Sequence, residues 1–372
     1  MENLRKQFVI AALNCANFSR LCREFGVSRK TGYKWIKRFE NEASLSNKSH
    51  SPLFVPNKTS AQVEQLILSV RSENPAWGGK TIKKVLENDN YFDIPSVKTC
   101  NNILKRNHCI SDSESLKHKP FIRFEKDFCN EMWQTDFKGD FLLLDGSRCF
   151  PLTILDDHSR FSIMIDPKPN TIGVLDSFKR AFYEFGMPNS ILSDNGAQFS
   201  GFRGGYTQFE RWLMDHDIFP KHGRIMHPQT QGKIERFHRT MNQELLKHCQ
   251  FSTLDDANNQ LQEWRTKYNC VRPHEALSMR CPSEVYTASD KEYVDKVKEY
   301  DYCGEFHMIK VNNWGYLRYA GFQIYLSETM RNTYLEIRPK EDDTFAVYYR
   351  NFVIASLNPA DGKLLNRRIA KP

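Results

Sequence analysis

Short apolar runs alternate with a segment of helical periodicity in the middle of the chain, and this alternation restricts the possible folds more than any other feature. The runs 149–156 and 160–166 are predicted strands joined by a short turn. Apolar residues then recur at helical spacing from Val174 to Phe185. Strands followed by crossover helices are typical of an α/β domain. We therefore predict an α/β core over residues 130–290.

The pattern changes to β after about residue 300. Apolar and aromatic runs at 306–311, 316–326, 334–337 and 345–354 are predicted strands separated by turn residues. Short strands in series with regular turns favour a small closed all-β domain. The predicted C-terminal domain, residues 300–372, is therefore a small β-barrel.

The first 45 residues are predicted to form a helix-turn-helix domain. Gly26 supplies the turn within the run 18–39, and Ser28 is placed to cap the second helix. A basic second helix is typical of DNA-binding domains, whereas a helical hairpin with no DNA role is the alternative. The predicted DNA contacts in this domain are Arg29, Lys30, Lys34 and Lys37.

A second helix-turn-helix domain is predicted at residues 60–112. Ser96 can cap a helix whose inner face is apolar, and Lys98 then points outward as a further predicted DNA contact. Linkers are predicted at 46–59, which is rich in Ser, Asn, Pro and Lys, and at 113–129. The predicted fold class is thus multidomain, with all-α helix-turn-helix domains, a central α/β domain and a C-terminal β-barrel.

The basic charge of the chain is concentrated at one end. The formal net charge is +8, but residues 1–125 carry 21 basic and 12 acidic side chains, against 32 and 33 in the remainder. A basic region of this kind indicates a polyanionic partner, most simply nucleic acid. The alternative is a set of solvated surface lysines.

Membrane insertion, export and a disulfide framework are all disfavoured. No apolar run approaches the roughly 18 residues of a spanning helix, and the run 8–13 is predicted to be the buried face of a first helix. The ten cysteines include no CxxC pair. We therefore expect reduced thiols in a cytoplasmic, nucleoid-associated protein with no membrane partner.

Three acidic residues stand out by their context. Asp136 lies in a strand-like segment that opens the α/β region, and Asp194 follows a later predicted strand. Glu235 lies in a predicted helix on the side opposite its apolar stripe. Converging carboxylates suit divalent metals that prefer oxygen ligands. Each acid taken alone could be a solvated surface residue, but the three together predict a metal site.

Such a site suits phosphodiester chemistry. Two Mg²⁺ ions about 3.5–4 Å apart can activate an attacking oxygen and stabilise the leaving oxygen. We expect two Mg²⁺ ions per active site, with Mn²⁺ as a substitute. Hydrolysis and transesterification use the same groups and differ only in the nucleophile.

Several segments resemble the motifs of DDE transposases in the retroviral integrase superfamily. The three that carry acids are Trp133-Gln-Thr-Asp136, Leu192-Ser-Asp-Asn-Gly196 and His227-Pro-Gln-Thr-Gln-Gly-Lys-Ile-Glu-Arg-Phe-His-Arg239. A fourth, Tyr268-Asn-Cys-Val-Arg-Pro-His-Glu-Ala-Leu277, resembles the segment that closes the catalytic domain of this family. The chain looks most similar to the IS481 branch of insertion-sequence transposases, close to the IS3 group.

The resemblance implies an RNase H-like fold in which Asp136, Asp194 and Glu235 are the catalytic, metal-binding triad. The last two are separated by 40 intervening residues, which is longer than in retroviral integrases. The extra length falls in the glycine-rich segment 200–206, whose role is open.

Residues around the acids receive weaker assignments. Asp156 and Asp157 are possible metal ligands, but a turn role is favoured, and Trp133 is predicted to be a core residue. Arg272 and His274 either position the last helix of the domain or contact DNA. Lys233 and Arg236 could instead be plain surface charges. The side chains predicted to hold DNA phosphates on or beside the active-site helix are Gln231, Lys233, Arg236 and Arg239.

The leading functional hypothesis is a DNA transposase that binds the inverted repeats of its element, cleaves 3′ ends and joins them to target DNA. The alternatives are a nuclease of the same fold and a domesticated DNA-binding protein. Joining two ends needs two active sites, so we expect a homodimer or a larger even-numbered complex on double-stranded DNA. An accessory targeting protein stays open as a partner.

Overall fold

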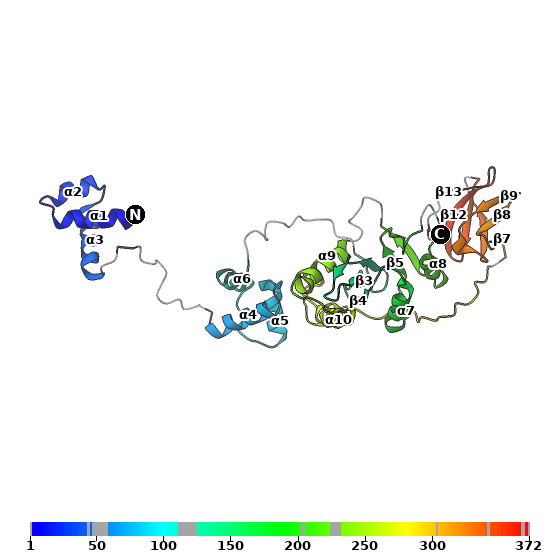
Figure 1. Cartoon of the computed structure of the whole chain (residues 1–372), viewed down its shortest axis with the longest axis horizontal. Helices are drawn as coiled ribbons and strands as arrows, with labels where there is room; N and C mark the ends of the chain where they lie inside the picture. The colour runs from blue at the N-terminus through cyan, green and yellow to red at the C-terminus, as the bar shows by residue number, and fades with distance from the viewer. Residues whose placement is uncertain are drawn as a thin grey trace. The chain divides into compact units, whose positions relative to one another are not determined.

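The chain separates into two compact units, residues 1–59 and 60–372. Figure 1 shows the computed structural model of the chain with most of its helices and strands labelled. The structure describes residues 2–42, 45–46, 59–110, 125–201, 205–223, 232–302, 304–340, 343–365 and 369–370.

The first unit contains three helices packed around Phe8. The helices are α1 (Glu2–Leu13), α2 (Phe18–Glu24) and α3 (Arg29–Glu42). The Phe8 ring meets the rings of Phe25 and Trp35 edge to face, with centroids 5.4 and 5.5 Å apart. The predicted turn and cap are confirmed: Gly26 has a φ of 64°, and the Ser28 hydroxyl accepts a hydrogen bond from the Thr31 amide at 3.1 Å.

A second set of three helices opens the larger unit. These are α4 (Ala61–Glu73), α5 (Gly79–Asn88) and α6 (Val97–Arg106), with a mainly aliphatic core centred on Ile67 and Ile82. Ser96 caps α6 as predicted, since its hydroxyl accepts a hydrogen bond from the Thr99 amide at 3.3 Å.

A mixed six-stranded sheet follows, built as the sequence predicts for an α/β core. Its strands are β1 (Trp133–Phe137), β2 (Phe141–Leu142), β3 (Arg148–Asp156), β4 (Ser162–Lys168), β5 (Ser190–Ser193) and β6 (Phe219–His222). The order is β2-β3-β1-β5-β6, with β4 on the outer side of β3. β1 is antiparallel to β3 but parallel to β5, and β5 is parallel to β6.

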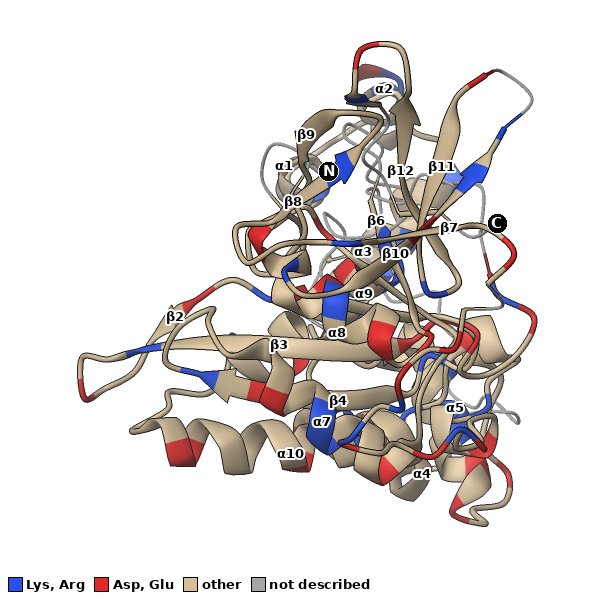
Figure 2. Ribbon diagram, turned by 90° about the vertical axis from the view of Figure 1, so that its right-hand side faces the viewer, with Lys and Arg blue, Asp and Glu red and all other residues tan. Residues whose placement is uncertain are grey.

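Helices cover both faces of this sheet. On one face lie α7 (Val174–Phe185) and α8 (Gln208–Asp215), and on the other lie α9 (Gly232–Met241), a π-helical turn (Asn242–Leu246) and α10 (Leu254–Cys270). Figure 2 shows α10 running along β4, against which it packs. Successive side chains of β3 point to opposite faces of the sheet: Ile154 packs towards α7, and Leu155 packs towards α9 and α10.

The C-terminal domain is β-rich as predicted, but the described strands do not close into a barrel. The sheet has the order β13-β12-β11-β10-β7, and β8 pairs with β9 in a separate hairpin. Closure requires hydrogen bonds between the two edge strands, and strand patterns in a sequence do not encode that pairing. The strands are β7 (His307–Lys310), β8 (Tyr316–Tyr319), β9 (Phe322–Tyr325), β10 (Tyr334–Pro339), β11 (Phe345–Tyr349), β12 (Phe352–Asn358) and β13 (Lys363–Leu365).

Two of the predicted single strands are hairpins. The run 316–326 turns at Ala320 and Gly321, and the run 345–354 turns at Arg350 and Asn351. Ala320 and Gly321 have φ of 47° and 84°, and Arg350 has a φ of 52°. Gly321 and Asn351 are typical turn residues, but each follows a residue, Ala320 or Arg350, that rarely adopts a positive φ, so both pairs are weaker hairpin signals than Asn-Gly or Asp-Gly.

The hydrophobic core of the C-terminal domain also includes side chains of the sheet domain. Tyr206 and Met214 pack among the buried residues of the C-terminal strands. The Tyr206 hydroxyl donates a hydrogen bond to the carbonyl of Ile354. Phe219 and Phe352 stack with ring centroids 6.2 Å apart. The α8–β6 edge of the sheet domain is therefore buried by the C-terminal domain.

Candidate active site

Parallel pairing brings the first two acids of the predicted triad to the same end of the sheet. β1 and β5 run parallel with Gln134 paired to Leu192. Asp136 lies two residues beyond Gln134, and Asp194 lies two residues beyond Leu192. Equal offsets from a paired register place both carboxylates at the carboxyl ends of neighbouring strands. The carboxyl end of adjacent strands is a common site for ligands in α/β sheets.

The third acid lies in the first turn of α9, which packs against β1. Ile234, Phe237 and Met241 are buried against the sheet, as the predicted apolar stripe requires. Glu235 is exposed and lies outside that stripe.

The three acids interact electrostatically. The pKa of Asp136 is raised to about 7, first by burial, then by the negative charges of Asp194 and of Glu235. The Asp136 side chain still keeps 24% of its surface exposed, so a cation has access to it. Carboxylates that repel one another at an accessible site provide the oxygen ligands that a divalent cation prefers. Over the described ranges, however, no three Asp, Glu, His or Cys side chains are drawn together into a ligand cluster.

His238 contributes a contact that the sequence analysis did not assign. Its Nε2 lies 2.7 Å from the Thr153 hydroxyl, which donates a hydrogen bond to the backbone carbonyl of Asp136 at 2.9 Å. Its Nδ1 lies 3.8 Å from the Asp136 carboxylate. The pKa of His238 is lowered to about 3 by burial and, secondly, by Lys138, so the imidazole is neutral. The sequence feature that could have identified His238 as a site residue is its position one helical turn after Glu235.

Asp156 and Asp157 are held by hydrogen bonds within the fold, as the predicted turn role requires. The Asp156 carboxylate accepts hydrogen bonds from the Asn130 amide, the Ser159 amide and the Ser159 hydroxyl at 2.8, 2.8 and 2.6 Å. The Asp157 carboxylate accepts from the Lys126 amide at 2.8 Å and from Gln134 Nε2 at 2.7 Å. Both residues are fully buried.

Lys233 is directed inward and does not extend from the surface of α9. Its ammonium donates hydrogen bonds to the Asp157 carboxylate and, at 3.0 Å, to the Asp157 carbonyl. The pKa of Lys233 is lowered to about 8 by burial first and by Arg160 second, while Asp157 opposes the shift. Only 12% of the Lys233 side chain is exposed. Its ammonium therefore pairs with Asp157, whereas the sequence predicted that it would contact a DNA phosphate.

The other predicted DNA contacts are on the surface, except one that falls outside the described residues. Gln231 is that exception. The exposed side chains are Arg29, Lys30, Lys34 and Lys37 on α3, Lys98 on α6, and Arg236 and Arg239 on α9.

The sequence left open whether Arg272 and His274 position the last helix of the domain or contact DNA. Their contacts in the structure favour the positioning role. Arg272 Nε donates a hydrogen bond to Glu244 at 2.7 Å, which ties the end of α10 to the π-helical turn. His274 is buried, with its ring 4.7 Å from that of Tyr268. Trp133 is fully buried, as predicted for a core residue.

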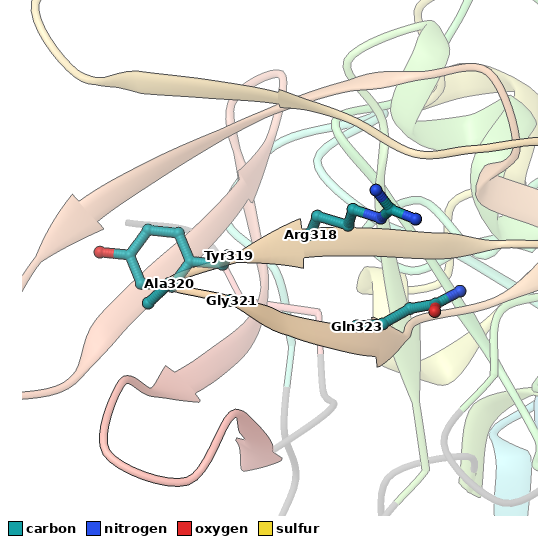
Figure 3. A pocket seen from close by; sticks show the side chains of 5 residues that line it. All are labelled: Arg318, Tyr319, Ala320, Gly321 and Gln323. Carbon is teal, nitrogen blue, oxygen red and sulfur yellow. The ribbon is translucent and has the colours of Figure 1, made fainter.

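Two cavities lie away from the triad. One, of about 400 Å³, is lined by Arg318, Tyr319, Ala320, Gly321 and Gln323 around the β8–β9 turn (Figure 3). The other, of about 210 Å³, lies between the β2 region and the segment that follows α9. Neither is lined by a residue of the predicted triad.

Comparisons with known proteins place similarity over most of the chain. Family models described as Integrase core domain match residues 129–228 and 216–282. A model described as Helix-turn-helix domain matches residues 4–52, and one described as Homeodomain-like domain matches residues 31–104, across the predicted linker. Within the described residues, no helix combines the length and apolar character needed to span a membrane.

Three of the curated relatives are named as proteins of insertion elements or of a transposon. The chain is 30% identical over 157 residues to the uncharacterized 31.7 kDa protein of insertion element IS407 from Burkholderia multivorans, which is 42% of this chain and 54% of that protein. It is 29% identical over 159 residues to the uncharacterized 39.2 kDa protein of insertion element IS476 from Xanthomonas euvesicatoria, covering 42% and 44%. It is 24% identical over 276 residues to the transposase for transposon Tn552 from Staphylococcus aureus, covering 66% and 55%. The chain thus spans about half the length of these relatives.

Solved structures with similarity include viral integrases. The HTLV-2 integrase catalytic core domain in complex with magnesium has 18% identity and a TM-score of 0.33, covering 43% of this chain and 99% of that one. The simian T-cell lymphotropic virus intasome, in complex with PP2A regulatory subunit B56 gamma, has 12% identity and a TM-score of 0.39, covering 76% and 91%.

Proposed function

We infer that this chain, a DDE transposase of the retroviral integrase superfamily by its integrase core, binds the ends of a DNA element, cleaves their 3′ termini and joins them to target DNA. One observation supports this proposal most directly. Asp136 and Asp194 share one end of the sheet, and Glu235 lies near enough to raise the pKa of Asp136 together with Asp194.

Asp136, Asp194 and Glu235 would hold the divalent cations. Bound Mg²⁺, two ions per site in our proposal with Mn²⁺ as a substitute, would supply charge stabilisation to the attacking and leaving oxygens of a phosphodiester. Neutral His238 borders Asp136 without adding a positive charge that would compete with a cation. The exposed side chains of Arg236 and Arg239 follow Glu235 on α9 and would contact phosphates beside the scissile bond.

The helical domains would supply binding to the element ends. The exposed basic side chains of α3 form one candidate phosphate-binding face, and Lys98 on α6 belongs to another. We propose a homodimer or larger even-numbered assembly on double-stranded DNA, because two ends must be joined to one target. We further propose that the protein is cytoplasmic and nucleoid-associated.

A strand-transfer assay tests the chemistry. Duplex oligonucleotides copied from the DNA that flanks the gene are incubated with the full chain, a supercoiled target plasmid and Mg²⁺ or Mn²⁺. We expect 3′-end cleavage and joined products that disappear in EDTA. Cleavage without joining would indicate a nuclease, and binding without either reaction would indicate a DNA-binding protein.

A salt titration tests the binding surface. Lys30→Ala, Lys34→Ala and Lys98→Ala should each reduce the slope of log affinity against log salt by about 1, since each removes one phosphate contact. Glu40→Ala on the same helix as Lys30 is the matched control, because Glu40 is exposed and acidic. Unchanged slopes in all three variants would remove these faces from the DNA interface.

A further inference from the structure

The start of α9 depends on side chains outside the helix. The first N–H groups of a helix have no partner within it. One of these, the Ile234 amide, donates a hydrogen bond to Gln134 Oε1 at 3.3 Å. Gln134 lies on β1, two residues before Asp136, and is 1% exposed. A residue of the strand that carries the first acid therefore contacts the residue immediately before the third acid.

Gln134 is oriented by its second hydrogen bond. Its Nε2 donates to Asp157 Oδ1 at 2.7 Å. An amide has one donor end and one acceptor end, so this contact directs the Oε1 atom towards α9. Asp157, in the turn directly after β3, thereby sets the position of a side chain that caps a helix from another part of the chain.

Lys233 adds an ionic contact next to the same helix start. Its ammonium contacts both the carboxylate and the carbonyl of Asp157. Residues 233 and 234, the two immediately before Glu235, are thus both tied to Asp157, one directly and one through Gln134. Arg160 also donates to the Asp157 carbonyl and, at 2.8 Å, to Glu125, so the surrounding charges are of both signs.

These ties act on the direction of Glu235. A shift of α9 by one residue would turn a side chain by about 100° around the helix axis and move it about 1.5 Å along that axis. A buried ion pair contributes little net stability, but it can select one register over others. The apolar stripe alone permits small slides of a helix, whereas two polar anchors at adjacent residues do not.

We propose that Gln134, Asp157 and Lys233 are positioning residues that hold Glu235 in register with Asp136, so that losing this network weakens divalent-cation binding more than it weakens the fold. The inference rests on the proposed function, because it concerns the same acidic site. Partners that orient the ligands of a metal site change metal affinity by about 10–100-fold when they are removed.

The experiment measures Mn²⁺ binding to the full chain without DNA by isothermal titration calorimetry, and thermal unfolding in EDTA. The main variant is the double substitution Asp157→Asn with Lys233→Met, which removes both charges and leaves no unpaired buried ion. We expect Mn²⁺ affinity to fall about 10–100-fold. Lys233→Arg, which keeps the charge, should retain most of the affinity. Gln134→Met, which introduces no charge change, serves if the double variant does not fold, and should also weaken Mn²⁺ binding.

Asp166→Asn is the matched control. Asp166 pairs with Arg180 at 2.6 Å and accepts a hydrogen bond from Ser177, so it joins β4 to α7 and not to α9. It should lower the unfolding temperature while leaving Mn²⁺ affinity unchanged. Wild-type affinity in both the double variant and Gln134→Met would overturn the inference.

The same measurements distinguish a failure of this inference from a failure of the proposed function. Mn²⁺ binding that is lost in Asp136→Asn but kept in the network variants would overturn only the positioning role. A wild-type chain that does not bind Mn²⁺ at all would overturn both.

Discussion

Aspartates lie near both ends of β1, but in opposite environments. Beside its beginning, where Trp133 pairs with Asp156, the carboxylates of Asp156 and Asp157 are fully buried and accept hydrogen bonds from several donors. Near its end, Asp136 is partly exposed and faces the negative charges of Asp194 and Glu235. Burial raises the pKa of Asp156, and its three donors oppose that rise.

We expect this contrast to separate structural acids from catalytic ones. A buried carboxylate surrounded by N–H and O–H donors has its hydrogen-bonding needs met by the fold. A carboxylate whose neighbours are other carboxylates destabilises the folded chain until a proton or a cation joins it. Groups of the second kind are candidates for function, and the stability they cost is a known trade-off in active sites.

The largest expected effect is the loss of chemistry at the end of β1. Asp136→Asn, Asp194→Asn and Glu235→Gln should each reduce DNA cleavage and joining to background, because an amide is a poorer metal ligand than a carboxylate. DNA binding, measured by mobility shift, should be retained. Robust strand transfer by Asp136→Asn would mean that the contrast between the two ends of β1 does not mark the active site.

Beside the beginning of β1, we expect a substitution to reduce stability and to leave activity in place. Asp156→Ala leaves the amides of Asn130 and Ser159 without their carboxylate partner, and each such buried donor costs about 1–3 kcal/mol. The free energy of unfolding, from urea titration, should fall accordingly. Activity per folded molecule should persist. If Asp156→Ala instead lost activity at full stability, the assignment of Asp156 as structural would be wrong.

A smaller effect should appear in the pH dependence of stability without metal. The pKa of Asp136 is about 7 in the folded chain against 3.8 for the unfolded group, so the folded state binds more protons between these values. Asp136 therefore costs no stability below pH 3.8, and the cost grows as pH rises to about 7 and then levels off. Asp136→Asn removes this cost.

Thermal unfolding in EDTA checks that sign. Relative to wild type, Asp136→Asn should be more stable at pH 8 and closer to wild type at pH 5. Mn²⁺ affinity of the wild type should rise between pH 5 and pH 7 as the competing proton leaves. A wild-type advantage that grew with pH in EDTA would contradict the like-charge environment assigned to Asp136.

The candidate site was predictable because its signals are local. Gly26, Ser28 and Ser96 act within a few residues of themselves, and their turn and capping roles were confirmed. The strand ends that carry Asp136 and Asp194 also follow from local apolar patterns. Their catalytic roles stay predictions until the variants are measured. The turns at Ala320-Gly321 and Arg350-Asn351 were missed because Ala and Arg rarely adopt a positive φ, which weakens the turn signal of the Gly or Asn that follows.

The role of Lys233 shows where sequence reasoning reached its limit. Its position beside Glu235 in a basic segment predicted a phosphate contact, but its ammonium lies against Asp157, 76 residues away in the chain. Asp157 looked like one of two similar acids in a turn. The packing of β1, β3 and α9 against one another gives Asp157 its contacts with Gln134 and Lys233, and these contacts show that it is not a metal ligand.

The sequence by itself determined the order of the domains, most of the helices and strands, and the strand and helix that carry each acid, because periodicity, caps and turns depend on neighbouring residues. The tertiary structure decided which acids receive hydrogen-bond donors, which basic side chain turns inward, and that the described C-terminal strands form an open sheet with a separate hairpin. These outcomes depend on pairings between distant segments, whose energies are set by burial and by the partners available there.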